Sequence, residues 1–216
     1  MNSLLYRFAL PLAVVLALGL PARAQFSNPD TSTTQVHNAA PLRPPAGARV
    51  ALVEWEDLEC PDCARANPVL AEAAEKYHIP WVRHDFPLPF HVWSFQAAVD
   101  ARWFDTRSKR LGDAFRDAVF ASQATIQSQE DLRRFAASFA EQHHTHFPIV
   151  VDPQGALREL VKDDYELGMS VGIRHTPTIW VVTNRKSGTP FVEVVDRTRL
   201  FTMIDEALSE TGPSRH

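Results

Sequence analysis

The sequence predicts an α/β protein in which helices cover both faces of a small sheet. Two observations support this prediction: apolar, β-rich segments alternate with helical segments, and a strand–helix–strand unit near the start is matched by a β-hairpin near the end. A strand, a helix and a second strand in this order form a parallel pair. The long helical block between this unit and the hairpin is interpreted as an insertion.

The strand–helix–strand unit begins with residues 49–57, which are mostly apolar, as in a strand that is buried on both faces. They lead into Cys60-Pro61-Asp62-Cys63 and then into an Ala-, Leu- and Glu-rich segment that favours helix. The two cysteines therefore lie at a strand-to-helix junction. Pro61 suits the first turn of the helix, whereas Pro68 lies inside it and is expected to kink it. Residues 81–86 form the second predicted strand.

Apolar residues three and four positions apart predict four helices in the inserted block, at residues 90–106, 111–122, 128–143 and 156–172. Ser128 and Asp131 match a weak capping box at the start of the third of these helices. The hairpin is predicted from two β-rich runs separated by a polar turn, at residues 179–183 and 191–196. Residues 198–210 are expected to form a closing helix.

Charge and composition exclude several functional classes. The chain has 216 residues, 22 Lys and Arg against 26 Asp and Glu, and a formal net charge of −4. This balance, without a basic run, argues against binding to nucleic acid or to an anionic membrane surface. A hydrophobic content of 45% fits a globular domain and excludes a disordered or collagen-like chain. The sequence lacks a phosphate loop and a dinucleotide fingerprint, so we expect no cofactor.

Residues 1–24 have the pattern of a cleavable secretory signal. Arg7 precedes an apolar stretch that is shorter than the roughly 20 residues needed to span a bilayer, and Ala22-Arg23-Ala24 matches the A-x-A cleavage pattern. The alternative is an uncleaved anchor, which the prolines in this stretch disfavour. Cleavage removes two arginines and no acid, so 20 bases remain against 26 acids and the net charge becomes −6. We therefore expect export to the periplasm or another extracytoplasmic compartment.

Residues 25–47 are rich in Pro, Ser, Thr and Asn and show no apolar periodicity. We expect a flexible or extended lead-in to one domain at about residues 48–210.

Cys60 and Cys63 are the only cysteines, too few for a multi-bridge scaffold or a four-thiolate zinc site. From the number of cysteines alone, the pair is either a redox centre or part of a mixed-ligand metal site. Unpaired N–H groups and the helix dipole stabilise a thiolate at a helix N-terminus, which makes Cys60 the expected nucleophile. Cys63 lies one turn further along and is expected to be more buried, as a resolving thiol. In an oxidising compartment such a pair tends to form a disulfide.

The strand ending in Cys60-Pro61-Asp62-Cys63, the helix with Pro68 and the late Thr176-Pro177 before a strand together resemble the thioredoxin superfamily. The helical block at about residues 88–172 is similar to the DsbA-like branch of exported thiol:disulfide oxidoreductases. The resemblance covers roughly residues 48–210 and implies a thioredoxin fold with a helical insertion domain. It also implies dithiol–disulfide exchange with cysteine-containing protein substrates. Disulfide formation is the expected activity, and a thiol reductase or isomerase of the same fold is the alternative.

The resemblance implies roles for individual residues. The two cysteines match the redox pair, and Glu54, six residues before the first, matches a buried acid that exchanges a proton with the inner thiol. Thr176-Pro177 matches a loop that packs beside the dithiol and pairs with an extended substrate segment, and Pro177 is predicted to be cis. His175 is either a positive partner of the Cys60 thiolate or a surface loop residue.

Pro61 and Asp62 are expected to tune the Cys60 thiolate. Strongly oxidising relatives carry Pro-His between the cysteines, and their imidazole helps stabilise the thiolate. Asp62 should oppose the thiolate, together with three acids that are near in sequence, Glu56, Asp57 and Glu59. We therefore predict a higher Cys60 pKa than in the Pro-His enzymes, above about 5, and a less oxidising disulfide. Glu59 is also expected to make the substrate-facing rim acidic.

A metallochaperone is the alternative from another functional class, in which both thiolates and His143, His144 or His146 would bind zinc or copper. These histidines lie at a predicted helix end, about 80 residues from the cysteines, where histidines usually are solvated or cap the last turn. We therefore assign no metal site. A redox cycle requires a membrane redox partner, either oxidising or reducing. No dimerisation domain is recognised, so we expect a monomer.

Overall fold

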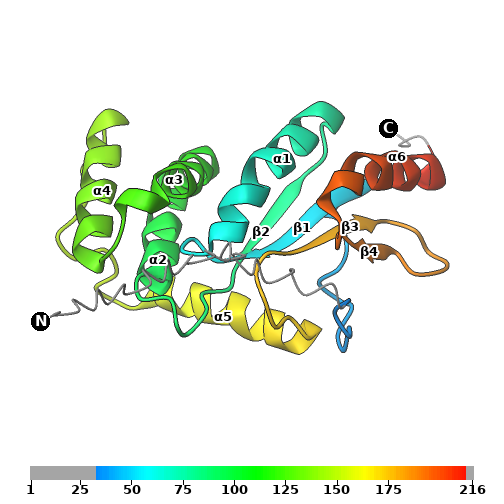
Figure 1. Ribbon diagram of the computed structural model, residues 1–216, viewed down its shortest axis with the longest axis horizontal. Coiled ribbons are helices and arrows are strands. Elements are labelled where there is room, and N and C mark those ends of the chain that lie inside the picture. Colours follow the sequence, from blue (N-terminus) through cyan, green and yellow to red (C-terminus); the bar gives the residue numbers. More distant parts are fainter. Residues whose placement is uncertain (1–32, 213–216) are drawn as a thin grey trace, which may run out of the picture. The chain divides into compact units, whose positions relative to one another are not determined.

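The computed structural model describes residues 33–212. The predicted signal at residues 1–24 and the start of the lead-in lie outside these residues. The described part of the chain contains a sheet with the strand order β2-β1-β3-β4 (Figure 1). Strand β1 pairs in parallel with β2 and antiparallel with β3, which pairs antiparallel with β4. The bounds are Val50–Glu56 for β1, Trp81–Asp85 for β2, Thr178–Thr183 for β3 and Phe191–Glu193 for β4.

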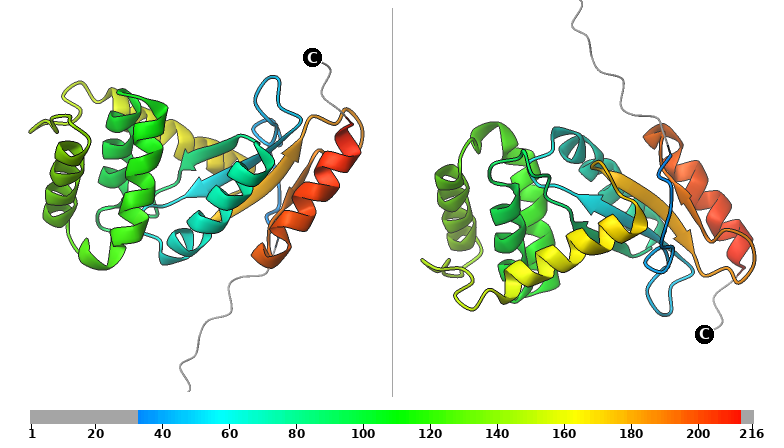
Figure 2. Two further views of the ribbon diagram at one scale, coloured as in Figure 1. Left: turned by 90° about the horizontal axis from the view of Figure 1, so that it is seen from above. Right: turned by 90° about the horizontal axis from the view of Figure 1, so that it is seen from below.

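Helices cover both faces of this sheet. Helices α1 (Pro61–Tyr77) and α6 (Leu200–Thr211) lie on one face, and α5 (Ala156–Val171) lies on the other (Figures 1 and 2). Side chains alternate along a strand, so Val50 and Leu52 pack on the α1 and α6 side, and Ala51, Val53 and Trp55 pack on the α5 side. All seven residues of β1 are buried, as its apolar sequence predicts.

The inserted block consists of α2 (Ser94–Asp105), α3 (Lys109–Ser122) and α4 (Gln129–Gln142), with the 3₁₀ turn η1 (Gln123–Thr125) between the last two. Their shared core is aromatic. The Phe104 ring stacks on Phe115, with centroids 4.5 Å apart, and meets Phe139 edge-on at 5.1 Å. Cys60 and Cys63 belong to the same apolar cluster. The insertion therefore packs directly against the dithiol end of α1.

The helix ends show how local sequence positions these elements. The Ser128 hydroxyl accepts the N–H of Asp131 at 3.1 Å and donates to the Asp131 carboxylate at 2.7 Å, so the predicted cap at α4 is confirmed. Pro61 is the first residue of α1, and Cys60 is its N-cap. Helix α1 continues through Pro68. No helix within residues 33–212 is long and apolar enough to cross a membrane.

The second hairpin strand is shorter than the sequence predicts. It ends at Glu193, although the apolar and β-branched run continues to Val195. The chain leaves the sheet because the carboxylate of Asp196 accepts the backbone N–H of Thr198 at 3.0 Å and begins the 3₁₀ turn η2 (Arg197–Arg199). This turn leads into α6.

The described part of the lead-in, for which the sequence predicts a flexible or extended segment, has no helix or strand and is attached to the domain. Thr34 donates two hydrogen bonds to the Glu193 carboxylate, from its N–H at 2.6 Å and its hydroxyl at 2.8 Å. The N–H of His37 donates to the carbonyl of Val171, and Leu42 is fully buried on the α5 side of the sheet. A single anchoring leucine produces no periodicity, which is why sequence patterns did not reveal this attachment.

Candidate active site

The two cysteines are free thiols at the N-terminus of α1. The Cys60 side chain starts from the N-cap, where the backbone is extended, and its thiol donates to the carbonyl oxygen of Thr176 at 3.3 Å. Cys60 is 6% exposed, whereas Cys63 is fully buried and accepts the N–H of Asp57 at 3.5 Å. The predicted difference in burial between the outer and inner thiols is confirmed.

The Cys60 thiol is acidic. A hydrogen bond from the Cys63 thiol makes the largest contribution, and the pKa of Cys60 falls to about 6 although burial opposes this. The Thr176 hydroxyl and the N–H groups of Asp62 and Cys63 lower the pKa further. The last two donors are those that the helix N-terminus leaves unpaired. A pKa of about 6 lies above the limit of 5 expected from the sequence.

The Cys63 thiol differs from Cys60. Burial raises the pKa of Cys63 well above its usual range, and hydrogen bonding to Cys60 raises it further. The negative charges of the Cys60 thiolate and Glu54 act in the same direction. Cys63 therefore holds its proton at a pH at which Cys60 is ionised, which suits a resolving thiol.

The loop of residues 175–177 lies against the dithiol. The bond between Thr176 and Pro177 is cis, the isomer that the sequence predicts. The Thr176 hydroxyl is buried and has no hydrogen-bond partner within the described chain, so it is free to donate to the Cys60 thiolate. His175 is half-buried and lies beside Thr178, whose hydroxyl donates to the His175 carbonyl at 2.7 Å. A role of His175 toward Cys60 stays a prediction.

Glu54 lies on β1 beneath α1. It is 1% exposed, and the indole N–H of Trp81 donates to its carboxylate at 3.0 Å. Burial raises the pKa of Glu54 well above its usual range, and the charge of Glu56 adds to this effect. The sequence analysis expected a raised pKa for this buried acid, and the structure agrees. The charges of Glu54 and Cys63 influence each other, so the two groups belong to one electrostatic unit.

Three of the acids expected to oppose the Cys60 thiolate have other partners. Glu56 is paired with the guanidinium of Arg83 at 2.9 Å and with Arg116 at 3.6 Å. Asp57 accepts the N–H groups of Leu88 and Glu59, and its carboxylate lies 2.7 Å from His91 Nδ1. The Glu59 carboxylate accepts the N–H groups of Trp93 and Ser94 at the start of α2, at 2.7 and 3.0 Å.

These pairings change how the acidic residues near Cys60 are interpreted. A carboxylate at a helix N-terminus is stabilised by the dipole and the unpaired N–H groups, so Glu59 fixes the start of α2. Both N–H groups bind the same oxygen, Oε2, and Glu59 is half-buried, so its carboxylate serves the start of α2, while an acidic substrate-facing rim stays a prediction. Sequence proximity to Cys60 placed these acids in one group, but each carboxylate serves a different element.

Asp62 has partners that the sequence analysis missed. The guanidinium of Arg197 forms a bidentate pair with its carboxylate, at 2.7 and 2.9 Å, and Arg65 adds a contact at 3.1 Å. Arg197 lowers the pKa of Asp62 most, so the carboxylate is ionised, but its charge is compensated. The expected opposition between Asp62 and Cys60 is thereby weakened. No local signal marked Arg197, which lies 135 positions later in the chain.

Gln123 is a second residue that the sequence analysis missed. Its side-chain amide donates to the carbonyl of Leu58 at 2.8 Å and to that of Cys60 at 3.1 Å. Gln123 belongs to η1, in the inserted block. The insertion thus contributes hydrogen bonds, as well as packing, to the loop that carries Cys60.

The structure gives no further support to the proposed metal ligands. His143 ends α4 and lies against Phe139, with ring centroids 4.2 Å apart, and His144 has a left-handed backbone at φ 55°. Among residues 33–212, no three His, Cys, Asp or Glu side chains are grouped so that they could hold a metal ion.

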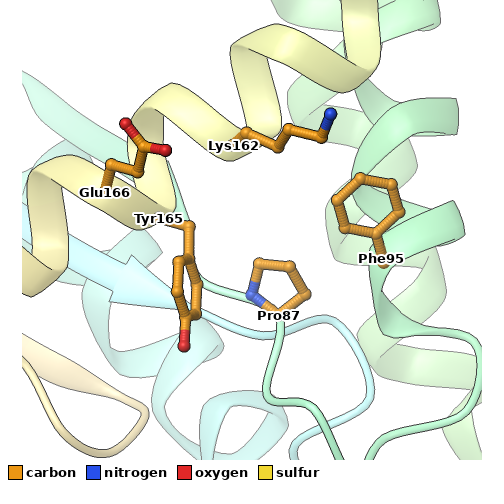
Figure 3. A pocket seen from close by; sticks show the side chains of 5 residues that line it. All are labelled: Pro87, Phe95, Lys162, Tyr165 and Glu166. Carbon is orange, nitrogen blue, oxygen red and sulfur yellow. The ribbon is translucent and has the colours of Figure 1, made fainter.

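A small cavity on the α5 side of the sheet lies outside the dithiol site. Figure 3 shows the side chains that line it, from α5, the start of α2 and the segment after β2. Its volume is about 220 Å³. It is lined by Pro87, Phe95, Lys162, Tyr165 and Glu166. The lining includes no thiol and no residue of the cis-proline loop, so we assign this cavity no part in dithiol chemistry.

The fold and site define a thioredoxin-fold protein with a dithiol at the N-terminus of its first helix. The profile of the family described as Thioredoxin matches residues 45–190, which is more than half of the chain. The protein belongs to this family. No curated protein sequence matches the chain.

Solved structures of DsbA-like proteins share the fold. Wolbachia pipientis alpha-DsbA1 is 20% identical, with a TM-score of 0.61 over 79% of this chain and 90% of that chain. Proteus mirabilis ScsC in a transitional conformation is 20% identical, with a TM-score of 0.59 over 76% and 70%. Pseudomonas aeruginosa DsbA2 is 21% identical, with a TM-score of 0.56 over 83% and 98%. The predicted thioredoxin fold with a DsbA-like helical insertion is confirmed.

Proposed function

We propose that the protein is an exported thiol:disulfide oxidoreductase that forms disulfides in cysteine-containing protein substrates. The observation that carries this proposal is the asymmetry of the dithiol. Cys60 is an acidic thiol at a helix N-cap, held 3.3 Å from the Thr176 carbonyl, whereas Cys63 is fully buried behind it. This is the arrangement that one nucleophilic and one resolving thiol require.

The reaction proceeds through a mixed disulfide. A substrate thiolate attacks Cys60 Sγ of the Cys60–Cys63 disulfide, a new intermolecular S–S bond forms, and the old bond breaks with Cys63 leaving as a thiolate. A second substrate thiolate then attacks the substrate sulfur of the mixed disulfide and releases the Cys60 thiolate. The substrate loses two electrons as its disulfide forms, and the protein gains both electrons in its two thiols.

Glu54 is proposed to supply the proton that the departing Cys63 thiolate needs. A thiol with a strongly raised pKa is a poor leaving group unless a proton reaches it during bond breaking. Glu54 is buried on β1 beneath α1, its charge interacts with Cys63, and its raised pKa lets it keep a proton to a higher pH than an exposed carboxyl group does. The same carboxylate would take the proton back when the disulfide is restored.

The direction of net reaction depends on which redox state of the pair the site stabilises, relative to the substrate and the redox partner. A Cys60 pKa of about 6 stabilises the reduced form at pH 7 and so favours oxidation of the substrate. It lies between the values of about 7 in thioredoxin and about 3.5 in strongly oxidising DsbA. This supports disulfide formation as the activity, with an intermediate oxidising strength. A reductase or isomerase is the alternative.

The proposal also includes a way to reoxidise the Cys60–Cys63 pair and an extracytoplasmic location. An oxidising membrane partner, linked to a quinone, would accept two electrons from the reduced pair and restore the disulfide. The sequence pattern of residues 1–24 supports export, and one solved neighbour is described as a periplasmic thioredoxin-like protein from Salmonella enterica. We expect the protein to act as a monomer.

The decisive test measures exchange chemistry directly. Equilibration of the purified protein with glutathione gives the potential of the pair, and refolding of a reduced, denatured disulfide protein gives the oxidase activity. Cys60→Ala should abolish both, and Cys63→Ala should trap a mixed disulfide with the substrate. Activity that survives Cys60→Ala would overturn the proposal.

Two further assays separate the alternatives. If the protein reduces insulin disulfides faster than it oxidises the reduced substrate in the refolding assay, at the same protein concentration, the reductase is favoured. Stoichiometric zinc or copper bound through both thiolates, without disulfide exchange, would favour a metallochaperone.

A further inference from the structure

Asp62, which lies between the two cysteines in the sequence, forms an ion pair with Arg197. Both oxygens of the Asp62 carboxylate are bound, at 2.7 and 2.9 Å, by the two terminal nitrogens of one guanidinium. The side chains are 28% and 31% exposed, so the pair is only partly screened by water. Bidentate pairs of this kind combine charge with fixed geometry.

The local sequence creates an electrostatic problem that this pair solves. Asp62 lies between the cysteines, and an uncompensated carboxylate beside a thiol disfavours the thiolate. The helix N-terminus favours the same thiolate. A guanidinium that cancels the charge of Asp62 leaves the effect of the helix N-terminus unopposed.

Arg197 is better suited to this task than Arg65, the other cation that contacts Asp62. The Arg65 side chain is 67% exposed and reaches a single carboxylate oxygen from the next turn of the same helix. Exposed pairs of this type contribute little, because water and salt screen them and the side chain stays mobile. Arg197 is less exposed and binds both oxygens.

The backbone that carries Arg197 is fixed. The preceding Asp196 side chain accepts the N–H and the hydroxyl of Thr198, at 3.0 and 2.7 Å, which shapes the turn η2. Leu200 follows this turn and is fully buried on the α1 and α6 side of the sheet. The charge of Arg197 also interacts with Cys63 and Glu54. One cation therefore acts on three groups of the site.

We propose that Arg197 is a positioning residue of the dithiol site, which holds and neutralises Asp62 and thereby sets how readily Cys60 forms its thiolate. This inference rests on the proposed thiol:disulfide exchange and adds the residue that adjusts its strength. The segment between β4 and α6 thus contributes to the redox site, beside the first strand, the first helix, the cis-proline loop and Gln123 of the inserted block.

A cycle of charge-removing variants tests the proposal. Arg197→Gln should raise the pH midpoint of Cys60 ionisation, followed by the ultraviolet absorbance of its thiolate, by roughly half a unit to one unit. Asp62→Asn should lower the midpoint, because Arg197 and Arg65 then remain uncompensated. The double variant should return close to wild type. Arg197→Lys, which keeps the charge and loses the bidentate geometry, should shift the midpoint less than Arg197→Gln.

Glutathione equilibration gives an independent readout of the same effect. If the Cys60 pKa rises from about 6 to about 7, the stabilisation of the reduced form at pH 7 falls about fivefold, and the disulfide becomes less oxidising by that factor. Arg199→Gln is the matched control. It removes the same charge from the same turn at an exposed position, and it should leave the midpoint and the equilibrium unchanged.

The outcomes distinguish this inference from the proposed function. Equal shifts in Arg197→Gln and Arg199→Gln, or an unchanged midpoint in Arg197→Gln, would overturn the role of Arg197. If Arg197→Gln does not fold, Asp62→Asn alone decides, and an unchanged midpoint there overturns the proposal. Failure of the wild-type protein to equilibrate with glutathione would overturn the proposed function instead.

Discussion

Glu54 and Glu56 are two glutamates of the same strand that differ in their partners. They are two positions apart on β1, point to the same face beneath α1, and are each 1% exposed. Glu56 is bound by the guanidinium of Arg83 and lies 3.6 Å from that of Arg116. Glu54 receives one hydrogen bond from the neutral indole of Trp81.

We propose that this difference separates a structural acid, Glu56, from a proton-exchanging acid, Glu54. Burial raises the pKa of both carboxyl groups, but two arginines oppose this effect at Glu56 and hold an ion pair between β1, β2 and α3. Without a direct cationic partner, Glu54 gains or loses a proton at lower cost to the fold. Burial is the same for both acids, so the proposed role of Glu54 rests on its neutral partner.

Arg83→Met is expected to have the largest effect on this comparison. It leaves Glu56 without its main partner and removes the hydrogen bond to Asn67, so the free energy of unfolding should fall by about 3–5 kcal/mol. Urea unfolding near neutral pH measures the change. Lys109→Met is the control, because it breaks an exposed ion pair with Asp113 and should cost less than about 0.5 kcal/mol. Similar losses in the two variants would contradict the structural role of Glu56.

Glu54→Gln should affect chemistry more than folding. The variant keeps the size of the side chain and removes its proton exchange, so release of Cys63 from the Cys60–Cys63 disulfide, as the mixed disulfide forms, should slow on the order of 10²-fold. Stopped-flow measurement of reduction by a dithiol peptide gives the rate. Glu72→Gln, at an exposed position of α1, is the control and should keep the wild-type rate. An unchanged rate in Glu54→Gln would remove Glu54 from the mechanism.

Glu54 should also leave a signature in the pH dependence of stability. Because its pKa is higher in the folded than in the unfolded state, the folded state binds the proton more tightly. Wild-type stability relative to Glu54→Gln should therefore fall as pH rises above about 4.5, and level off above the folded-state pKa. Urea unfolding of both proteins across this range measures the difference. A pH-independent difference would show that Glu54 does not titrate with a raised pKa.

Trp81→Phe is expected to have the smallest effect. It removes the single N–H that binds Glu54, and a hydrogen bond to an ionised carboxylate is worth more than one to a neutral carboxyl group. The loss of stability should be larger above the Glu54 pKa than below it, by about 1 kcal/mol. The lost packing is the same at both pH values, so urea unfolding at each pH isolates the hydrogen bond. Equal losses would show that the indole does not respond to the charge of Glu54.

Much of the fold was predictable because its signals are local. The apolar run of β1, the apolar periodicity of the inserted helices and the serine cap of α4 each act over a few residues, and the structure bears them out. The early end of β4 and the attachment of the lead-in were not predicted. The early end of β4 follows from Asp196, whose carboxylate accepts the N–H of Thr198 two positions further on, although the β-rich run predicts a longer strand. The attachment of the lead-in depends on Leu42, a single buried residue whose neighbours lie far along the chain.

In the active site, too, some features follow from the local sequence and others do not. Cys60 and Cys63 at a strand-to-helix junction, with different burial and an acidic outer thiol, follow from spacing, helix geometry and the helix dipole, which neighbouring residues establish by themselves. The balance of charge around them does not follow from spacing. Asp62 was expected to act against Cys60, and chain folding instead brings Arg197 to it from 135 positions away. Coulomb interactions depend on distance in space, so only the folded chain determines which charges remain free to act on the thiolate.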